Sequence, residues 1–199
     1  MRAAARAFCL AAALAPCAAT AASAGADPGL AGVPAAEGLP AEGNCTACHA
    51  SSALNPDTRG TIEILGLPER YQPGERYALT LRLAHPDETR TRWGFQLTAV
   101  DAKRRRGVGE LVVTDEASTQ RLEGGPGGRQ YLEQTSDGSA IGKQGEQQWR
   151  FAWVAPAKDV GDVAFFGGGN ASNADGSNQG DWIFNPTPEP LATVRAPAK

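Results

Sequence analysis

Gln148-Trp149-Arg150-Phe151-Ala152-Trp153 places an aromatic ring at every second position. Side chains in an extended strand alternate between its two faces, so these rings all point to the same side. A strand with one aromatic face and one mostly polar face is typical of a sheet that packs against other structure on one side only. This stretch therefore predicts a half-buried strand, with Trp149, Phe151 and Trp153 as the best core candidates in the chain.

The same alternation recurs on the N-terminal side of this stretch. Tyr77–Leu83 and Phe95–Val100 both carry large apolar side chains at alternate positions. Further strands are expected between turn signals rich in Gly, Pro and Asp, at Thr61–Leu65, Glu110–Thr114, Gln130–Gln134, Asp162–Phe166 and Asp181–Phe184. We therefore predict an all-β fold, an antiparallel immunoglobulin-like β-sandwich of about eight or nine strands with an irregular N-terminal segment.

The composition agrees with this fold class. The 199 residues include 24 glycines and 14 prolines, an excess that suits a chain with many turns. With 19 basic and 22 acidic side chains the net charge is −3, which argues against nucleic acid as a partner. A hydrophobic content of 41% excludes a wholly disordered chain, and the length suits one domain with its own core.

Residues 1–24 predict a secretory signal peptide. Arg2 and Arg6 precede a short apolar run, Phe8–Ala15, and Ala22-Ser23-Ala24 has the small-x-small form of a cleavage site. The apolar run is too short to span a bilayer, and no second one follows it. We therefore expect an exported protein, periplasmic or secreted, without a transmembrane segment.

Four segments are expected after the signal peptide. Residues 25–43, the leader, are rich in Ala, Gly and Pro and are expected to lie along the domain or to be mobile. Residues 44–56, the CxxCH segment, carry a cysteine motif, residues 57–186 form the sandwich, and residues 187–199 form a tail. Because Cys9 and Cys17 leave with the signal peptide, Cys45 and Cys48 are the cysteines of the processed chain.

Cys45-Thr46-Ala47-Cys48-His49 matches the C-x-x-C-H pattern of covalent c-type haem attachment. Each thiol would form a thioether with one vinyl group, and His49 would be the proximal iron ligand of one haem per chain. A Cys45–Cys48 disulfide, favoured by an oxidising compartment, stays open as an alternative. A zinc site is less favoured, because few other ligands are available to complete it.

The sixth iron ligand is constrained by composition. Met1 leaves with the signal peptide, so a methionine ligand is excluded, and His85 is the candidate distal ligand. The simpler interpretation of His85 is a loop histidine. Without it, the iron would be five-coordinate or would take a lysine, an asparagine or a ligand from another chain. Trp93 or Tyr71 is expected at the edge of the haem.

Two polar segments have both a simple and a functional interpretation. Lys103-Arg104-Arg105-Arg106 predicts a solvated turn, with a docking patch for an acidic partner as the alternative. Residues 170–181 are dense in oxygen ligands but do not fit EF-hand spacing. A polar connection is the simpler interpretation there, and a calcium loop using Asn173, Asp175 and Asp181 is the secondary one. No catalytic triad or phosphate loop stands out, so an enzyme is not expected.

The order of motifs resembles bacterial proteins with a reeler-like (reelin-type) domain, the group described as choice-of-anchor V domain proteins. The matching pieces are Gly43–His49, Ile64–Pro68, Tyr71–Tyr77, Trp93–Ala99, Trp149–Pro156 and the loop that closes on Gly180-Asp181. The resemblance implies a secreted β-sandwich that carries a CxxCH motif, and it implies no defined activity. We find no sorting tail after the domain, which favours a soluble periplasmic or released protein.

Two hypotheses for function follow. The first is an exported monohaem c-type cytochrome on a reeler-like β-sandwich, acting in electron transfer or redox-coupled binding with an unidentified redox partner. The alternative is a non-catalytic secreted module that binds a surface or matrix ligand and carries a Cys45–Cys48 disulfide. His49 separates the two, because a disulfide has no need of it.

Overall fold

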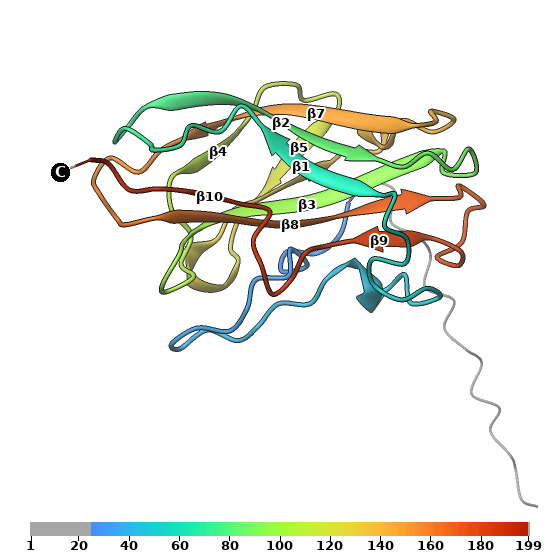
Figure 1. Ribbon diagram of the computed structural model, residues 1–199, viewed down its shortest axis with the longest axis horizontal. Coiled ribbons are helices and arrows are strands. Elements are labelled where there is room, and N and C mark those ends of the chain that lie inside the picture. Colours follow the sequence, from blue (N-terminus) through green and yellow to red (C-terminus); the bar gives the residue numbers. More distant parts are fainter. Residues whose placement is uncertain (1–24, 199) are drawn as a thin grey trace, which may run out of the picture.

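The computed structural model describes residues 25–198, so the predicted signal peptide lies outside the described residues. In this range ten strands form two antiparallel sheets packed face to face (Figure 1). The first sheet has the order β1 (Thr61–Leu65), β2 (Arg76–Ala84), β7 (Glu146–Val154) and β4 (Glu110–Val113). The second has the order β10 (Ala192–Val194), β8 (Val163–Ser172), β3 (Arg92–Asp101), β6 (Tyr131–Gln134) and β5 (Thr119–Leu122), with β9 (Trp182–Phe184) also paired to β8. Three 3₁₀ turns, η1 (Cys45–Ala47), η2 (Pro126–Gly128) and η3 (Asp137–Ser139), complete the elements, and the predicted all-β sandwich is confirmed.

The space between the sheets holds the aromatic residues expected there. Trp149, Phe151 and Trp153 of β7 are all buried. Phe95 of the second sheet packs against Trp149 with ring centroids 4.5 Å apart, and Phe165 meets Trp153 edge-on at 5.2 Å. Since each such ring buries roughly 150–250 Å², these contacts are a large part of what holds the two sheets together.

The leader lies along the outer face of the second sheet (Figure 1). Ala31 and Val33 are fully buried there, and they pack with Val100, Ala164 and Phe166 of the sheet in a second, smaller core. The second sheet is therefore covered on both faces, which explains why its outward side chains are buried although many are polar.

Two strands and part of a third were not expected from the sequence. β5 is mostly polar, and β10 lies within the expected C-terminal tail, where it pairs with the edge of β8. β8 also continues through a run of three glycines, residues 167–169. A Cβ on Gly168 would lie 2.7 Å from the side chain of Asn185, and one on Gly169 would lie 2.7 Å from Leu83. Close packing on both faces of β8 therefore explains why glycines stand in this part of the strand, although they show no strand pattern in the sequence.

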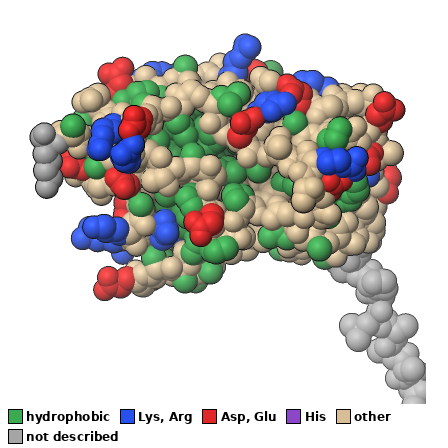
Figure 2. Space-filling model, viewed as in Figure 1, with side chains coloured by type: hydrophobic (Ala, Val, Ile, Leu, Met, Phe, Trp, Pro, Cys, Tyr) green, Lys and Arg blue, Asp and Glu red, His purple; other side chains and the backbone are tan. Residues whose placement is uncertain are grey.

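The basic run after β3 forms an ordered turn, in agreement with its simpler interpretation. The Asp101 carboxylate accepts hydrogen bonds from the backbone N–H groups of Lys103, Arg104 and Arg106, and the Arg105 guanidinium lies 5.0 Å from the Phe166 ring centroid. Basic and acidic side chains are intermixed on the face drawn in Figure 2, with hydrophobic side chains towards its middle. No helix in the described part of the chain is long and apolar enough to cross a membrane.

Candidate functional site

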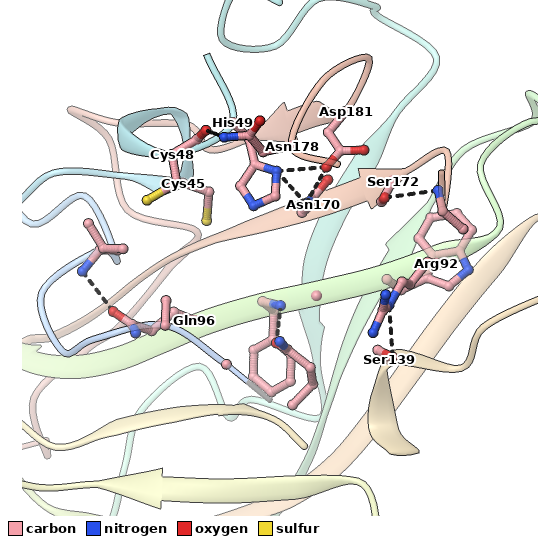
Figure 3. A pocket seen from close by; sticks show the side chains of 18 of the residues that line it. Cys45, Cys48, His49, Arg92, Gln96, Ser139, Asn170, Ser172, Asn178 and Asp181 are labelled. Atoms are coloured by element: carbon pink, nitrogen blue, oxygen red, sulfur yellow. Dashed lines mark hydrogen bonds and ion pairs between the residues drawn. The ribbon is translucent and has the colours of Figure 1, made fainter. Parts of the chain in front are cut away.

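A cavity, partly open to solvent, lies on the outer side of β3 and β8. Its walls come from the leader, the CxxCH segment, the two strands and the loop that follows β8, and mostly apolar atoms line it. Cys45, Cys48 and His49 all face it (Figure 3).

A short capped turn presents the motif to this cavity. Asn44 begins η1, and its side-chain oxygen accepts hydrogen bonds from the Thr46 N–H at 2.9 Å and the Thr46 hydroxyl at 2.7 Å. The His49 N–H donates to the Cys45 carbonyl at 3.0 Å, which closes the turn. The motif spacing therefore places two thiols and one imidazole on the same side of a single turn.

Both thiols of the motif are free in the structure, so no disulfide joins Cys45 to Cys48. Burial raises the pKa of the Cys45 thiol to about 11, and the neighbouring Cys48 thiol adds to this rise. Cys45 is therefore protonated at neutral pH in the metal-free chain. Within residues 25–198, no cluster of three or more His, Cys, Asp or Glu side chains is arranged to hold a metal ion.

A buried carboxylate orients the His49 imidazole. Nδ1 of His49 lies 2.6 Å from Oδ2 of Asp181, whose side chain is 1% exposed. The amide nitrogen of Asn170 lies 3.3 Å from both atoms. Because the Asn170 amide N–H and a protonated His49 Nδ1 are both donors, they cannot bond to each other. We therefore assign the Asn170 amide as a donor to Asp181. The carboxylate thus accepts from both neighbours and fixes the plane of the imidazole ring.

The protonation state of Asp181 determines which histidine nitrogen is free. Burial alone would raise the Asp181 pKa, but hydrogen bonds from His49, Ser172 and Asn170 outweigh it and lower the pKa below its ordinary value. Asp181 is therefore ionised at neutral pH, and His49 carries its proton on Nδ1. The second ring nitrogen, Nε2, faces the cavity on the side away from Asp181 (Figure 3).

The polar loop after β8 supports the CxxCH segment. The Asn178 side chain donates to the Cys48 carbonyl at 2.6 Å, and the Gly180 N–H donates to the Ser51 hydroxyl at 2.7 Å. Within the loop, the Asp175 carboxylate accepts from Ser177 and Asn173, while Asp181 points to His49. These hydrogen bonds agree with the simpler interpretation of the loop as a polar connection, and the calcium loop stays a prediction.

His85 lies apart from the cavity, and the structure does not bring it together with His49. Its ring is fully buried beside Trp182 at 4.7 Å and Phe184 at 5.8 Å. Nδ1 accepts from the Asp87 N–H at 3.0 Å, while Nε2 lies 3.3 Å from Asp57 Oδ2 but is poorly aligned for a hydrogen bond. The position of His85 is that of a packed core side chain, between the first strands and β9.

The two aromatic residues expected at a haem edge are also separated. Trp93 lines the cavity, whereas Tyr71 is buried against Trp153 with ring centroids 5.9 Å apart. The sequence did not indicate the leader as a cavity wall, although Leu30 lines it and donates its N–H to Gln96 at 2.7 Å. Gln96, a polar side chain at an outward-facing position of the buried strand β3, is the one sequence feature that could have indicated this contact.

A scan against protein-family models and a search of curated proteins gave no match. Among solved structures, the Reelin-N domain of F-spondin has a TM-score of 0.50 and 19% identity, over 77% of this chain and 97% of that one. The human F-spondin reeler domain (fragment 1) gives 0.48 and 21%, over 69% and 89%. AvmM, which catalyses macrocyclization in alchivemycin A biosynthesis, gives 0.43 and 13%, over 72% and 91%. The first likeness shows that this chain has a reeler-like fold.

Proposed function

We propose that the cavity is a covalent haem site and that the protein is an exported, non-catalytic haem-binding module on a reeler-like β-sandwich. One observation carries this proposal: His49 presents Nε2 to a mostly apolar cavity that it shares with two free thiols, while a buried carboxylate holds its Nδ1. Cys45 and Cys48 would hold the porphyrin, and His49 would hold the iron. When bound, the haem supplies one-electron redox chemistry, suited to electron transfer or redox-coupled binding.

The residues present fit this group. A histidine that ligates a metal commonly donates its other ring N–H to a carboxylate, which fixes the ring and raises its basicity. The 2.6 Å contact between His49 and Asp181 has this arrangement. The Asn170 side-chain oxygen is buried at the cavity and has no hydrogen-bond partner in the described structure, so one acceptor is available to a bound group.

The distal role that the sequence suggested for His85 is not part of this proposal. Among residues 25–198, the cavity lining includes no second histidine, no methionine and no lysine. We therefore expect iron with His49 as its strong protein ligand. Any further ligand to the iron would then have to come from outside this cavity lining.

A binding module without haem is the second candidate. The fold likeness to the F-spondin Reelin-N domain supports a binding sandwich and does not by itself call for a cofactor. In this case the cavity would take a small apolar ligand without covalent attachment. The Cys45 and Cys48 thiols, which are free in the structure, would then form the disulfide expected in an oxidising compartment.

Export of the full chain in a host with c-type maturation separates the candidates. We expect a c-type α-band in the pyridine haemochrome spectrum and colour that persists through denaturing electrophoresis. Cys45→Ala/Cys48→Ala should abolish covalent colour, while Ser51→Ala, a matched change in the same segment, should retain it. A folded but colourless wild-type protein would contradict the haem proposal and leave the second candidate.

A further inference from the structure

Glu133 of β6 is a buried carboxylate without a basic side chain beside it. It is 2% exposed, and within the described residues no Lys, Arg or His forms an ion pair with it. Its oxygens accept from the side chains of Gln120 at 2.9 Å and Gln96 at 3.3 Å, and from the Ala26 N–H at 3.1 Å. Burial raises the pKa of Glu133, because the ionised form loses its hydration. A buried anion in this position calls for a positive charge.

The backbone of Gly25 lies against this carboxylate. A Cβ at Gly25 would overlap the Glu133 carboxyl group and would also lie 2.9 Å from the Gln120 side-chain nitrogen. The φ angle of Gly25 is +106°, which an L side chain rarely adopts. Both observations call for glycine at this position, in direct contact with the acid.

Gly25 is also the residue that follows the predicted cleavage site, Ala22-Ser23-Ala24. Hydrolysis of the Ala24–Gly25 peptide bond consumes one water, leaves a carboxylate on Ala24 and creates an amine on Gly25. With an ordinary pKa of about 7.7–8.0, that amine is mostly protonated at neutral pH. Processing would therefore create one positive charge at the residue that touches the unpaired acid.

We propose that Glu133 is the binding site for the α-ammonium group that signal-peptide cleavage creates on Gly25. The ion pair fastens the start of the leader to β6, next to the existing contact between Ala26 and Glu133. Gly25 and Ala26 also line the cavity, so the ion pair completes a wall of the site. This inference rests on the cavity geometry and the cleavage motif, and it holds with or without haem.

The first test is the mass of the N-terminal peptide of the exported protein. We expect a chain that begins at Gly25 with a free amine. We also expect acetylation of that amine to be at least tenfold slower in the folded protein than in the denatured protein. A different first residue, or equal acetylation rates, would overturn the proposal without a variant having to fold.

A second test compares two forms of the protein, one that begins at Gly25 and one engineered to begin at Ala24. Glu133→Gln should raise the unfolding equilibrium constant of the Gly25 form about tenfold or more, because it leaves a buried ammonium without its partner. The Ala24 form has no ammonium at this position, so the same substitution should change its constant less than about threefold.

Glu42→Gln is the matched control for this comparison. Glu42 is also an acid with a buried side chain (3% exposed) and belongs to the leader itself, but it already pairs with Arg129 at 2.5 Å and with the Tyr131 hydroxyl. The Glu42→Gln substitution should therefore destabilise the Gly25 form and the Ala24 form equally. An equal effect of Glu133→Gln on both forms would contradict the proposed pairing, whatever the haem content of the protein.

Discussion

The two faces of β3 pack against different kinds of surface. On the inner face, Phe95 and Leu97 are buried among the apolar side chains of the opposite sheet. On the outer face, Gln96 is equally buried, but it exchanges hydrogen bonds with the leader at Leu30 and Asp27. Burial on the inner face depends on apolar area, which many side chains can provide, whereas burial on the outer face depends on the small apolar cluster of the leader and, in addition, on particular polar partners. The cavity lies on the outer face, where substitutions can alter the site and leave the sandwich core intact.

Removal of a core ring should have the largest effect on stability. It should destabilise the packing on both faces of β3 together. Trp149→Ala is expected to reduce the free energy of unfolding by about 3–5 kcal/mol, since it leaves a large cavity beside Phe95. Denaturant titration followed by tryptophan fluorescence measures this. Ile141→Ala, at a 70% exposed position, is the control and should change little. A loss below about 1 kcal/mol for Trp149→Ala would mean that the inner face does not carry the fold.

Asp181→Asn should weaken the outer site and spare the core. We expect a loss of about 1–3 kcal/mol at pH 7, because a buried acceptor of the His49 N–H is replaced by a poorer one. The folded-state pKa of Asp181 lies below its ordinary value of 3.8, so its contribution is present above that value and is lost as pH falls through the folded pKa. The stabilities of wild type and variant should therefore converge in acid. A constant difference from pH 7 to about pH 2 would contradict this role.

Asn178→Ala should have the smallest effect. It removes one hydrogen bond to the Cys48 carbonyl, worth about 1 kcal/mol or less in global stability. Amide hydrogen exchange should nevertheless become faster in η1 and stay unchanged in β7, because the loss is local to the CxxCH segment. Faster exchange throughout β7 would mean that the two faces are coupled more tightly than their packing indicates.

The sequence predicts the inner face well because that face depends on local alternation. The expected strand at 61–65 matches β1, and those at 77–83 and 148–153 lie within β2 and β7. β5 and β10 were missed because pairing with neighbours, rather than a pattern of their own, makes them strands. The glycine run of β8 was missed because its reason lies in the side chains that pack onto it.

The site is predicted only as far as its local motif. The spacing of Cys45, Cys48 and His49 can be recognised directly, but the partner of His49, Asp181, lies 132 residues away. The sequence suggests for Asp181 only a place in a polar connection or, secondarily, in a calcium loop. His85 follows a strand and precedes a proline, which suggests an accessible loop. His85 is instead buried against Trp182 and Phe184. These contacts join distant parts of the chain, so no local sequence pattern predicts them.

The contact between His49 and Asp181 also has a consequence for timing. A chain that emerges N-terminus first delivers the thiols and the imidazole long before the loop that holds them. At roughly 5–20 residues per second, the intervening 132 residues take about seven seconds or more to synthesise. During that interval His49 lacks its carboxylate partner, and the Cys48 carbonyl lacks the hydrogen bond from Asn178. The loop between β8 and β9 then supplies both contacts, so the CxxCH segment can dock in its final position only after β8 is complete.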